Sequence, residues 1–136
     1  NVSKDFKITN DYDTTMCLMK SRKGVLVHIN NSRRAVYGYD QRLEVFGSNG
    51  MLISDNVPIN DINYFNQNLS FAKKPIKNFF LDRYTDAYQT QLDQFIKSIK
   101  NKKNTSVTFE DGKNALILAN SATKSVKSNK VVKPKF

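Results

Sequence analysis

The sequence predicts an α+β fold, in which a mostly antiparallel β-sheet has two or more helices packed on one face. Three observations predict this class. Apolar and polar residues alternate in the first half of the chain, turn-forming residues separate the alternating stretches, and apolar residues recur at steps of three and four from about residue 78 onward. Strands followed by helices are typical of a sheet that carries its helices on one side.

Two β-hairpins and one further strand are predicted in the first half. Residues 12–20 and 24–32 alternate in hydropathy, and the turn-like sequence Ser21-Arg22-Lys23-Gly24 joins them. Residues 41–47 and 51–54 flank the sequence Ser48-Asn49-Gly50. Short glycine-containing connections between alternating stretches are typical of β-hairpins. Residues 62–68 form the fifth predicted strand.

The second half has the period of α-helices. The first helix is predicted from about residue 78 to 100, with one apolar stripe: Leu81, Tyr84, Tyr88, Leu92, Phe95 and Ile99. A second helix is predicted over 111–127, with Glu110 or Asp111 near its N-cap. The apolar residues within 131–134 are predicted to form one short edge strand.

Length and charge limit the classes of protein to which this chain can belong. A chain of 136 residues can bury a core as one domain, so residues 1–136 are predicted to be a single domain. No apolar run approaches the about 20 residues of a membrane-spanning helix. The net charge of +10 invites a nucleic-acid interpretation, but 17 of the 22 basic residues are Lys rather than Arg. Because base and phosphate readers favour Arg, we interpret the charge as a solvated surface and predict no nucleic-acid partner.

Metal and nucleophilic chemistry have little support in the sequence. His28 is the single histidine and Cys17 the single cysteine, which together do not make a metal-ligand set. Cys17 alternates with apolar neighbours and is interpreted as a small buried hydrophobe. The single cysteine and the polar residues 1–13, which have no secretory signal pattern, predict a cytoplasmic protein.

Residues 30–52 are chemically unusual. This segment holds three of the five arginines and two of the six tyrosines, with Gly38 between Tyr37 and Tyr39. The glycine permits close approach of a backbone or a ligand. Tyrosine hydroxyls and side-chain amides suit a polyhydroxylated ligand, since they offer both donors and acceptors. The same residues could also form a polar strand edge with surface ion pairs, and residue chemistry alone leaves both interpretations open.

The order of residues in this segment resembles the inositol dehydrogenases of the Gfo/Idh/MocA oxidoreductase family. The resemblance extends over roughly residues 12–128, and its most specific part is the run at 31–42, Asn-Ser-Arg-Arg-Ala-Val-Tyr-Gly-Tyr-Asp-Gln-Arg. Residues 44–48, 50–52, 79–84 and 110–112 also resemble the family. The resemblance implies a hydride transfer between a carbinol carbon of a polyol such as myo-inositol and NAD or NADP. It also favours Tyr37 and Tyr39, with Arg34 and Gln41 as weaker candidates, for contacts with the substrate or on the nicotinamide side. For each of these residues, packing or a surface ion pair remains the alternative.

The family's catalytic and cofactor motifs are absent from these 136 residues. The family begins with a Rossmann domain that carries a glycine-rich loop and a catalytic Lys in an E-K-P motif, and its substrate domain supplies an Asp and a His in D-x-x-x-H. None of these occurs here, and His28 does not match that histidine. The chain therefore resembles the C-terminal portion of the substrate-binding and oligomerisation domain. We expect the catalytic groups upstream of residue 1 and no cofactor bound to this chain alone. Asn30 stands where the family usually has Asp, so no charge role is carried over to it.

An exposed apolar sheet face predicts self-association. If helices cover only one face, then Met16, Leu18, Phe46 and Met51 need a partner, most simply a second copy of the chain. The resemblance implies the same, because family members commonly form tetramers through the open sheet face. Two alternatives remain at this point: a stand-alone oligomerisation or sugar-binding module without catalysis, and a nucleic-acid binder that uses the Lys-rich surface.

Overall fold

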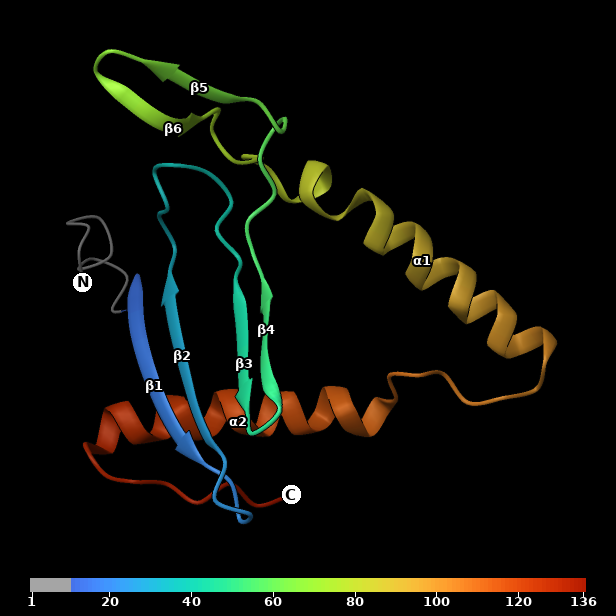
Figure 1. The fold of residues 1–136 in the computed structure, drawn as a ribbon. Coiled ribbons are helices and arrows are strands. Elements are labelled where there is room, and N and C mark those ends of the chain that lie inside the picture. The colour runs from blue at the N-terminus through green and yellow to red at the C-terminus, as the bar shows by residue number, and fades with distance from the viewer. Residues whose placement is uncertain (1–10) are drawn as a thin grey trace. The chain divides into compact units, whose positions relative to one another are not determined.

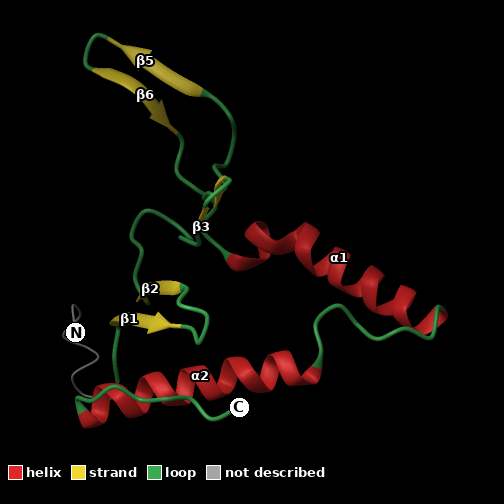
Figure 2. Ribbon diagram, turned by 60° about the horizontal axis from the view of Figure 1, so that its bottom comes forward, coloured by secondary structure: helices red, strands yellow, loops and turns green. Residues whose placement is uncertain are grey.

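The structure, a computed structural model, describes residues 11–136 and contains six strands followed by two helices (Figure 1). The strands are β1 (Thr14–Lys20), β2 (Leu26–Ser32), β3 (Leu43–Gly47), β4 (Gly50–Ser54), β5 (Asn63–Asn66) and β6 (Leu69–Lys73), and the helices are α1 (Phe80–Lys100) and α2 (Phe109–Ser128). Every strand pair is antiparallel. The predicted α+β class is therefore confirmed. Among the described residues the strands form three separate two-stranded sheets. The pairs β1–β2 and β5–β6 are visible as yellow arrows in Figure 2.

The first hairpin has the predicted turn. β1 and β2 pair from Thr14 opposite Ser32 to Lys20 opposite Leu26. The turn is held by two bonds to Ser21, whose backbone N–H donates to the Val25 carbonyl (2.9 Å) and whose hydroxyl accepts from the Val25 N–H (3.0 Å). Gly24 has a φ of +87°, in the region that favours glycine.

The register of this hairpin sorts its side chains onto two faces. Residues opposite each other in the pair share a face, so Met16, Leu18 and Leu26 lie on one face and Cys17 and Met19 on the other. Leu18 and Leu26 are 78% and 77% exposed, whereas Cys17 and Met19 are half-buried. The exposed apolar face that the alternation predicted is therefore present in β1 and β2.

The second hairpin is tighter than predicted. Gly47 pairs with Gly50, so only Ser48 and Asn49 form the loop, and β4 begins one residue earlier than expected. Gly50 has a φ of +143°, which residues with a Cβ rarely adopt. Phe46 lies opposite Met51, and both side chains are exposed.

The third hairpin corrects the predicted strand at 62–68. Its first strand, β5, ends at Asn66, and the sequence prediction missed β6 altogether. The Asn66 side-chain carbonyl accepts from the backbone N–H groups of Asn68 (2.7 Å) and Leu69 (2.9 Å). Asparagine commonly makes such local turns, which stop a strand where hydropathy alone would continue it.

Both predicted helices are present with shifted boundaries. α1 ends at Lys100, and Lys102 with a φ of +52° and the bond from the Lys103 N–H to the Ser98 carbonyl (3.0 Å) close it. α2 begins at Phe109 with Thr108 as its N-cap. Glu110 and Asp111 lie near the N-cap as predicted, and Asp111, the third helical residue, bonds back to Thr108 in a capping box.

The short edge strand predicted within 131–134 is wrong. These residues form no strand and pair with none of the strands described. Asn129 has a φ of +52° and ends α2, and the chain continues in an irregular conformation. Two adjacent valines favour an extended backbone, but a strand also needs a neighbouring chain to complete its hydrogen bonds.

The chain divides into two compact units, Asn1–Asp86 and Ala87–Phe136, so the division falls within α1. Between residues 11 and 136 only Asp13 and Gly38 are buried, and no large apolar side chain is buried. Each unit by itself therefore leaves its large apolar side chains at least partly accessible. No helix in this part of the chain is long and apolar enough to span a bilayer. Residues 1–10, which hold most of the polar segment without a secretory signal pattern, lie outside the described residues.

Candidate functional site

The segment that links β2 to β3 is held against two others by backbone hydrogen bonds. The Tyr39 N–H donates to the Lys77 carbonyl (2.9 Å), and the Lys77 N–H donates to the Val57 carbonyl (2.9 Å). An isolated bridge between Pro58 and Ile76 lies beside them. Residues 75–77 therefore run between the Tyr-Gly-Tyr sequence and residues 57–59, and they anchor the backbone of Tyr39, one of the two predicted substrate-contacting tyrosines.

Gly38 permits this close packing. Its φ is +136°, and a Cβ added to it would lie 2.3 Å from Ile76 Cγ1 and 3.0 Å from the Ile76 carbonyl oxygen. Both the conformation and the space therefore require glycine here. The sequence predicted close approach of a backbone or a ligand at this position, and the structure shows a neighbouring chain segment there.

A polar cluster surrounds the Asp40 carboxylate. Its Oδ1 accepts from Arg42 Nε (2.8 Å) and Asn56 Nδ2 (2.7 Å), and its Oδ2 accepts from Arg42 Nη2 (2.9 Å) and from the Tyr37 hydroxyl. The Asp40 side chain is only 16% exposed. We call Tyr37, Asp40, Arg42 and Asn56 the Asp40 cluster.

The bonds within the Asp40 cluster set its protonation. Hydrogen bonding from Arg42, followed by that from Tyr37 and Asn56, holds the pKa of the Asp40 carboxyl well below its usual range. The bond to Asp40 raises the pKa of the Tyr37 hydroxyl above 10.0, and desolvation adds to this effect. Near neutral pH Asp40 is therefore ionised and Tyr37 protonated, so Asp40 is poorly suited to act as a general base.

Tyr39 has a different environment. Its ring meets the Tyr84 ring edge-on, with 5.6 Å between the ring centroids. The Arg83 guanidinium carbon lies 5.5 Å from the centroid of the same Tyr84 ring, and Arg83 Nε is buried with no hydrogen-bond partner. The start of α1 therefore holds Tyr39 by aromatic packing, which fits the packing interpretation of this residue as well as a binding role.

The structure brings only part of the predicted site together. Tyr37 lines a cavity of about 340 Å³, within the range of small-ligand sites, together with Arg42, Asp55, Asn56, Pro58, Lys73, Lys74 and Ile76. Tyr39, Arg34 and Gln41 do not line it. Gln41 contributes its backbone N–H to Asn56 Oδ1 (2.8 Å), and the Arg34 backbone bonds the Ser32 hydroxyl. The role of these four residues in substrate binding stays a prediction.

Sequence reasoning missed Asp40, Asn56 and Tyr84 as members of this arrangement. Asp40 and Arg42 are two residues apart, a spacing that can bring their side chains to the same side of an extended chain, so their pair had a local signal. Asn56 is sixteen positions from Asp40 and Tyr84 is forty-five from Tyr39, and no pattern within one sequence links such positions.

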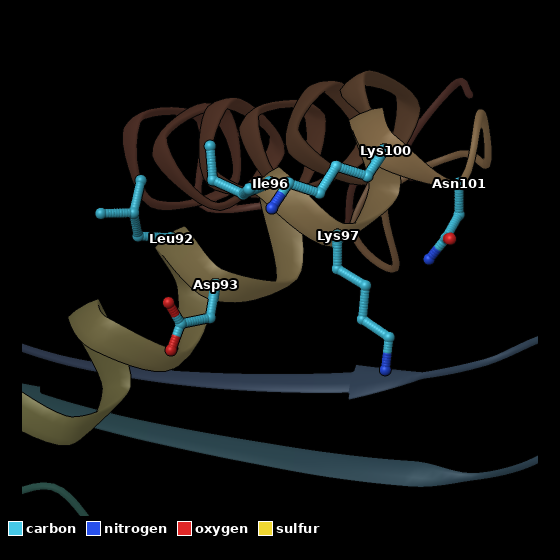
Figure 3. A pocket seen from close by; sticks show the side chains of 6 residues that line it. All are labelled: Leu92, Asp93, Ile96, Lys97, Lys100 and Asn101. Carbon is cyan, nitrogen blue, oxygen red and sulfur yellow. The ribbon is translucent and has the colours of Figure 1, made fainter.

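A second hollow, of about 510 Å³, lies along α1 and carries no convergent chemistry. Leu92, Asp93, Ile96, Lys97, Lys100 and Asn101 line it (Figure 3), and they come from the last turns of α1 and the residue that follows it. Within residues 11–136 no group of three or more His, Cys, Asp or Glu side chains could hold a metal ion. The Asp40 cluster and its cavity are therefore the better candidate site.

Comparison with known proteins identifies the family. Residues 2–133 match the C-terminal alpha/beta domain of the Gfo/Idh/MocA oxidoreductase family. The chain belongs to this family. The match covers nearly all of the chain, and it confirms the family resemblance that residues 31–42 indicated.

Two relatives of the chain are named as inositol dehydrogenases. A myo-inositol 2-dehydrogenase of Thermotoga maritima is 40% identical over 132 residues, which are 97% of this chain and 39% of that protein. An inositol 2-dehydrogenase of Rhizobium meliloti is 35% identical over 125 residues, 92% of this chain and 38% of that protein. The chain thus spans about two fifths of the length of the curated relatives it matches.

Solved structures agree with the sequence relatives. A crystal structure of a myo-inositol dehydrogenase from Corynebacterium glutamicum matches with a TM-score of 0.93 and 39% identity, over 100% of this chain and 41% of that one. A putative myo-inositol dehydrogenase from Sinorhizobium meliloti matches with a TM-score of 0.90 and 34% identity, over 96% of this chain and 39% of that one. The α+β fold is therefore the fold of the C-terminal part of these dehydrogenase structures.

Proposed function

We propose that this chain is the C-terminal portion of the substrate-binding and oligomerisation domain of a cytoplasmic, nicotinamide-dependent polyol dehydrogenase, with myo-inositol as the expected substrate. The observation that carries the proposal is the match of nearly the whole chain to one domain of an oxidoreductase family whose relatives here are inositol dehydrogenases. Residues 1–136 act as one domain in this account.

Within the domain, Tyr37 is the first candidate for contact with the polyol. Its hydroxyl belongs to the Asp40 cluster, whose members Tyr37, Arg42 and Asn56 line the 340 Å³ cavity. There Arg42, Lys73 and Lys74 can supply donors, and Asp55 can supply acceptors. Each hydroxyl of a polyol both donates and accepts, so a mixed lining suits it. Tyr39, Arg34 and Gln41 remain candidates on the strength of the resemblance, although they lie outside this cavity.

The hydride acceptor is assigned to another part of the parent enzyme. Bound there, NAD or NADP would accept a hydride from the carbinol carbon. This chain has no glycine-rich loop of the G-x-G-x-x-G type, so its residues do not fit the pyrophosphate of such a cofactor. Its own residues would bind and orient the polyol, while the proton-removing base lies in the remaining three fifths of the enzyme.

We further propose that the exposed face of β1 and β2 is an interface between copies of the chain, as in a tetramer. Met16, Leu18 and Leu26 lie together on that face, and each is more than two-thirds exposed. Neighbouring apolar side chains of this exposure are unusual on a monomer. A symmetric assembly would remove them from water.

An assay of the isolated 136-residue chain tests whether the cofactor site and the catalytic base lie in another part of the enzyme. We expect no reduction of NAD or NADP in the presence of myo-inositol, since the chain lacks the cofactor loop. Turnover by the isolated chain would contradict the proposal. Binding of myo-inositol at micromolar concentration with no cofactor present would instead favour the stand-alone sugar-binding module, and retention of an RNA or DNA oligomer at physiological salt would favour the nucleic-acid binder.

A further inference from the structure

The Tyr37 hydroxyl has a single proton, and the structure shows where it goes. The hydroxyl donates to Asp40 Oδ2. A phenolic oxygen that donates one hydrogen bond can still accept another, because its lone pairs remain free. Toward the cavity that it lines, Tyr37 is therefore an acceptor and not a donor.

Asp40 is held firmly enough to impose this orientation. Each of its carboxylate oxygens accepts two hydrogen bonds, and both bonds from Arg42 are charge-assisted. Its side chain is 16% exposed, so rotation away from Arg42 would leave a poorly solvated charge without its counter-ion. The raised pKa of Tyr37 agrees with a proton that stays on the phenol near neutral pH.

We propose that Asp40 is a positioning residue, which holds the Tyr37 hydroxyl so that it accepts a hydrogen bond from a hydroxyl group of the ligand in the adjacent cavity. The inference rests on the polyol substrate proposed above and adds a selection rule. At the position facing Tyr37 the ligand must carry a donor, so a hydroxyl is favoured over a carbonyl, an ether or a fluorine. Lys73 and Lys74, which line the same cavity, can supply donors to the ligand's other oxygens.

The first test needs no enzymatic activity. The test uses the full-length protein that carries this chain, and phenolate absorbance is recorded as pH is raised. The signal of Tyr37 is obtained by subtracting the absorbance of a variant that also carries Tyr37→Phe from that of the otherwise identical protein. We expect Asp40→Asn to lower the pKa of Tyr37 toward the ordinary value of about 10, and Asp40→Glu to restore part of the shift. An unchanged Tyr37 titration in Asp40→Asn would overturn the proposed hold on the hydroxyl.

The second test separates positioning from a structural role. Asp40→Asn is expected to raise KM for myo-inositol about five- to tenfold with little change in kcat, as for loss of one ground-state hydrogen bond. In a Tyr37→Phe background the same substitution should have no further effect on KM, because the group that it positions is gone. An equal rise in KM in both backgrounds would show that Asp40 merely stabilises the loop, and would contradict the proposal.

The two tests also separate this inference from the proposed function. If the protein oxidises no polyol, the proposed function fails, and the inference about ligand selection fails with it. This holds even if Asp40→Asn shifts the titration of Tyr37. If polyol oxidation is present but KM ignores Asp40→Asn, only the positioning role fails. A tenfold higher KM for an analogue fluorinated at one carbon, seen in the wild type and absent in Tyr37→Phe, would support the selection rule directly.

Discussion

Contacts of Gly38 and Asp40 with their neighbours determine how the Tyr-Gly-Tyr sequence is packed. Gly38 lies against Ile76 because it has no Cβ, and Asp40 binds three neighbouring side chains because both of its oxygens face donors. The sequence predicted the close approach at Gly38, because a residue without a Cβ permits it. It did not predict the Asp40 cluster, because Asn56 reaches Asp40 from a separate loop that no local pattern links to it.

Replacing Gly38 tests the close approach. Gly38→Ala places a Cβ 2.3 Å from Ile76 Cγ1 at a φ of +136°, so we expect a loss of about 1–3 kcal/mol in the free energy of unfolding measured with urea. Gly112→Ala is the matched control. Its Cβ would meet nothing within 4 Å inside α2, and it should be neutral or stabilise by up to about 1 kcal/mol. Equal stability of the Gly38→Ala variant and the wild type would contradict the packing described here.

The Asp40 cluster predicts a specific dependence of stability on pH. The pKa of Asp40 is lower in the folded chain than the unfolded value of about 3.9, so its contribution is complete above that value and falls as pH drops below it. The difference in urea midpoint between wild type and Asp40→Asn should be constant from about pH 5 to 7 and shrink toward pH 3. A difference that stays constant down to pH 3 would rule out an ionised, hydrogen-bonded Asp40.

At the scale of elements, periodicity succeeded wherever it extended over several residues. The hairpins β1–β2 and β3–β4 and both helices were predicted, because alternation at period two or an apolar stripe at period 3.6 extends over many consecutive residues there. The failures were local. The Asn66 side chain ends β5 and the Thr108 hydroxyl starts α2, and hydropathy records neither hydrogen bond. The valines within 131–134 had the propensity for a strand but no partner strand.

The capping box of α2 gives an element-scale prediction. Thr108→Ala removes the hydroxyl that accepts from the Asp111 N–H, so the free energy of unfolding should fall by about 1 kcal/mol. Thr108→Ser keeps the hydroxyl and should retain most of the stability. If thermal or urea unfolding shows that both variants lose the same amount, the cap does not contribute through this hydroxyl.

At the scale of the whole molecule, apolar surface is the outstanding feature. None of the described apolar side chains is fully buried, and three of them share one face of the first hairpin. Length and composition predicted a domain that could bury a core, and the α+β class was right. Composition cannot record whether that core is completed within one copy or between copies, so self-association through β1 and β2 stays a prediction, which the strand register supports.

Sedimentation of the full-length protein tests the interface. Leu18→Glu places a charge among the exposed apolar side chains of β1 and β2, so we expect a tetramer to dissociate into smaller species. Lys23→Glu, in the turn of the same hairpin, reverses a charge outside the apolar face and should leave the sedimentation coefficient unchanged. Dissociation by both variants, or by neither, would contradict an interface on this face.

The central claim is that this chain supplies the substrate side of a polyol dehydrogenase, and one measurement tests it most directly. The chain is joined to the remaining N-terminal part of the Thermotoga maritima relative, with which it shares 40% identity, and reduction of NAD is recorded with and without myo-inositol. We predict reduction that depends on myo-inositol and falls about tenfold in kcat/KM when Tyr37 is replaced by Phe. A folded hybrid that reduces no NAD with myo-inositol or any related polyol would contradict the account.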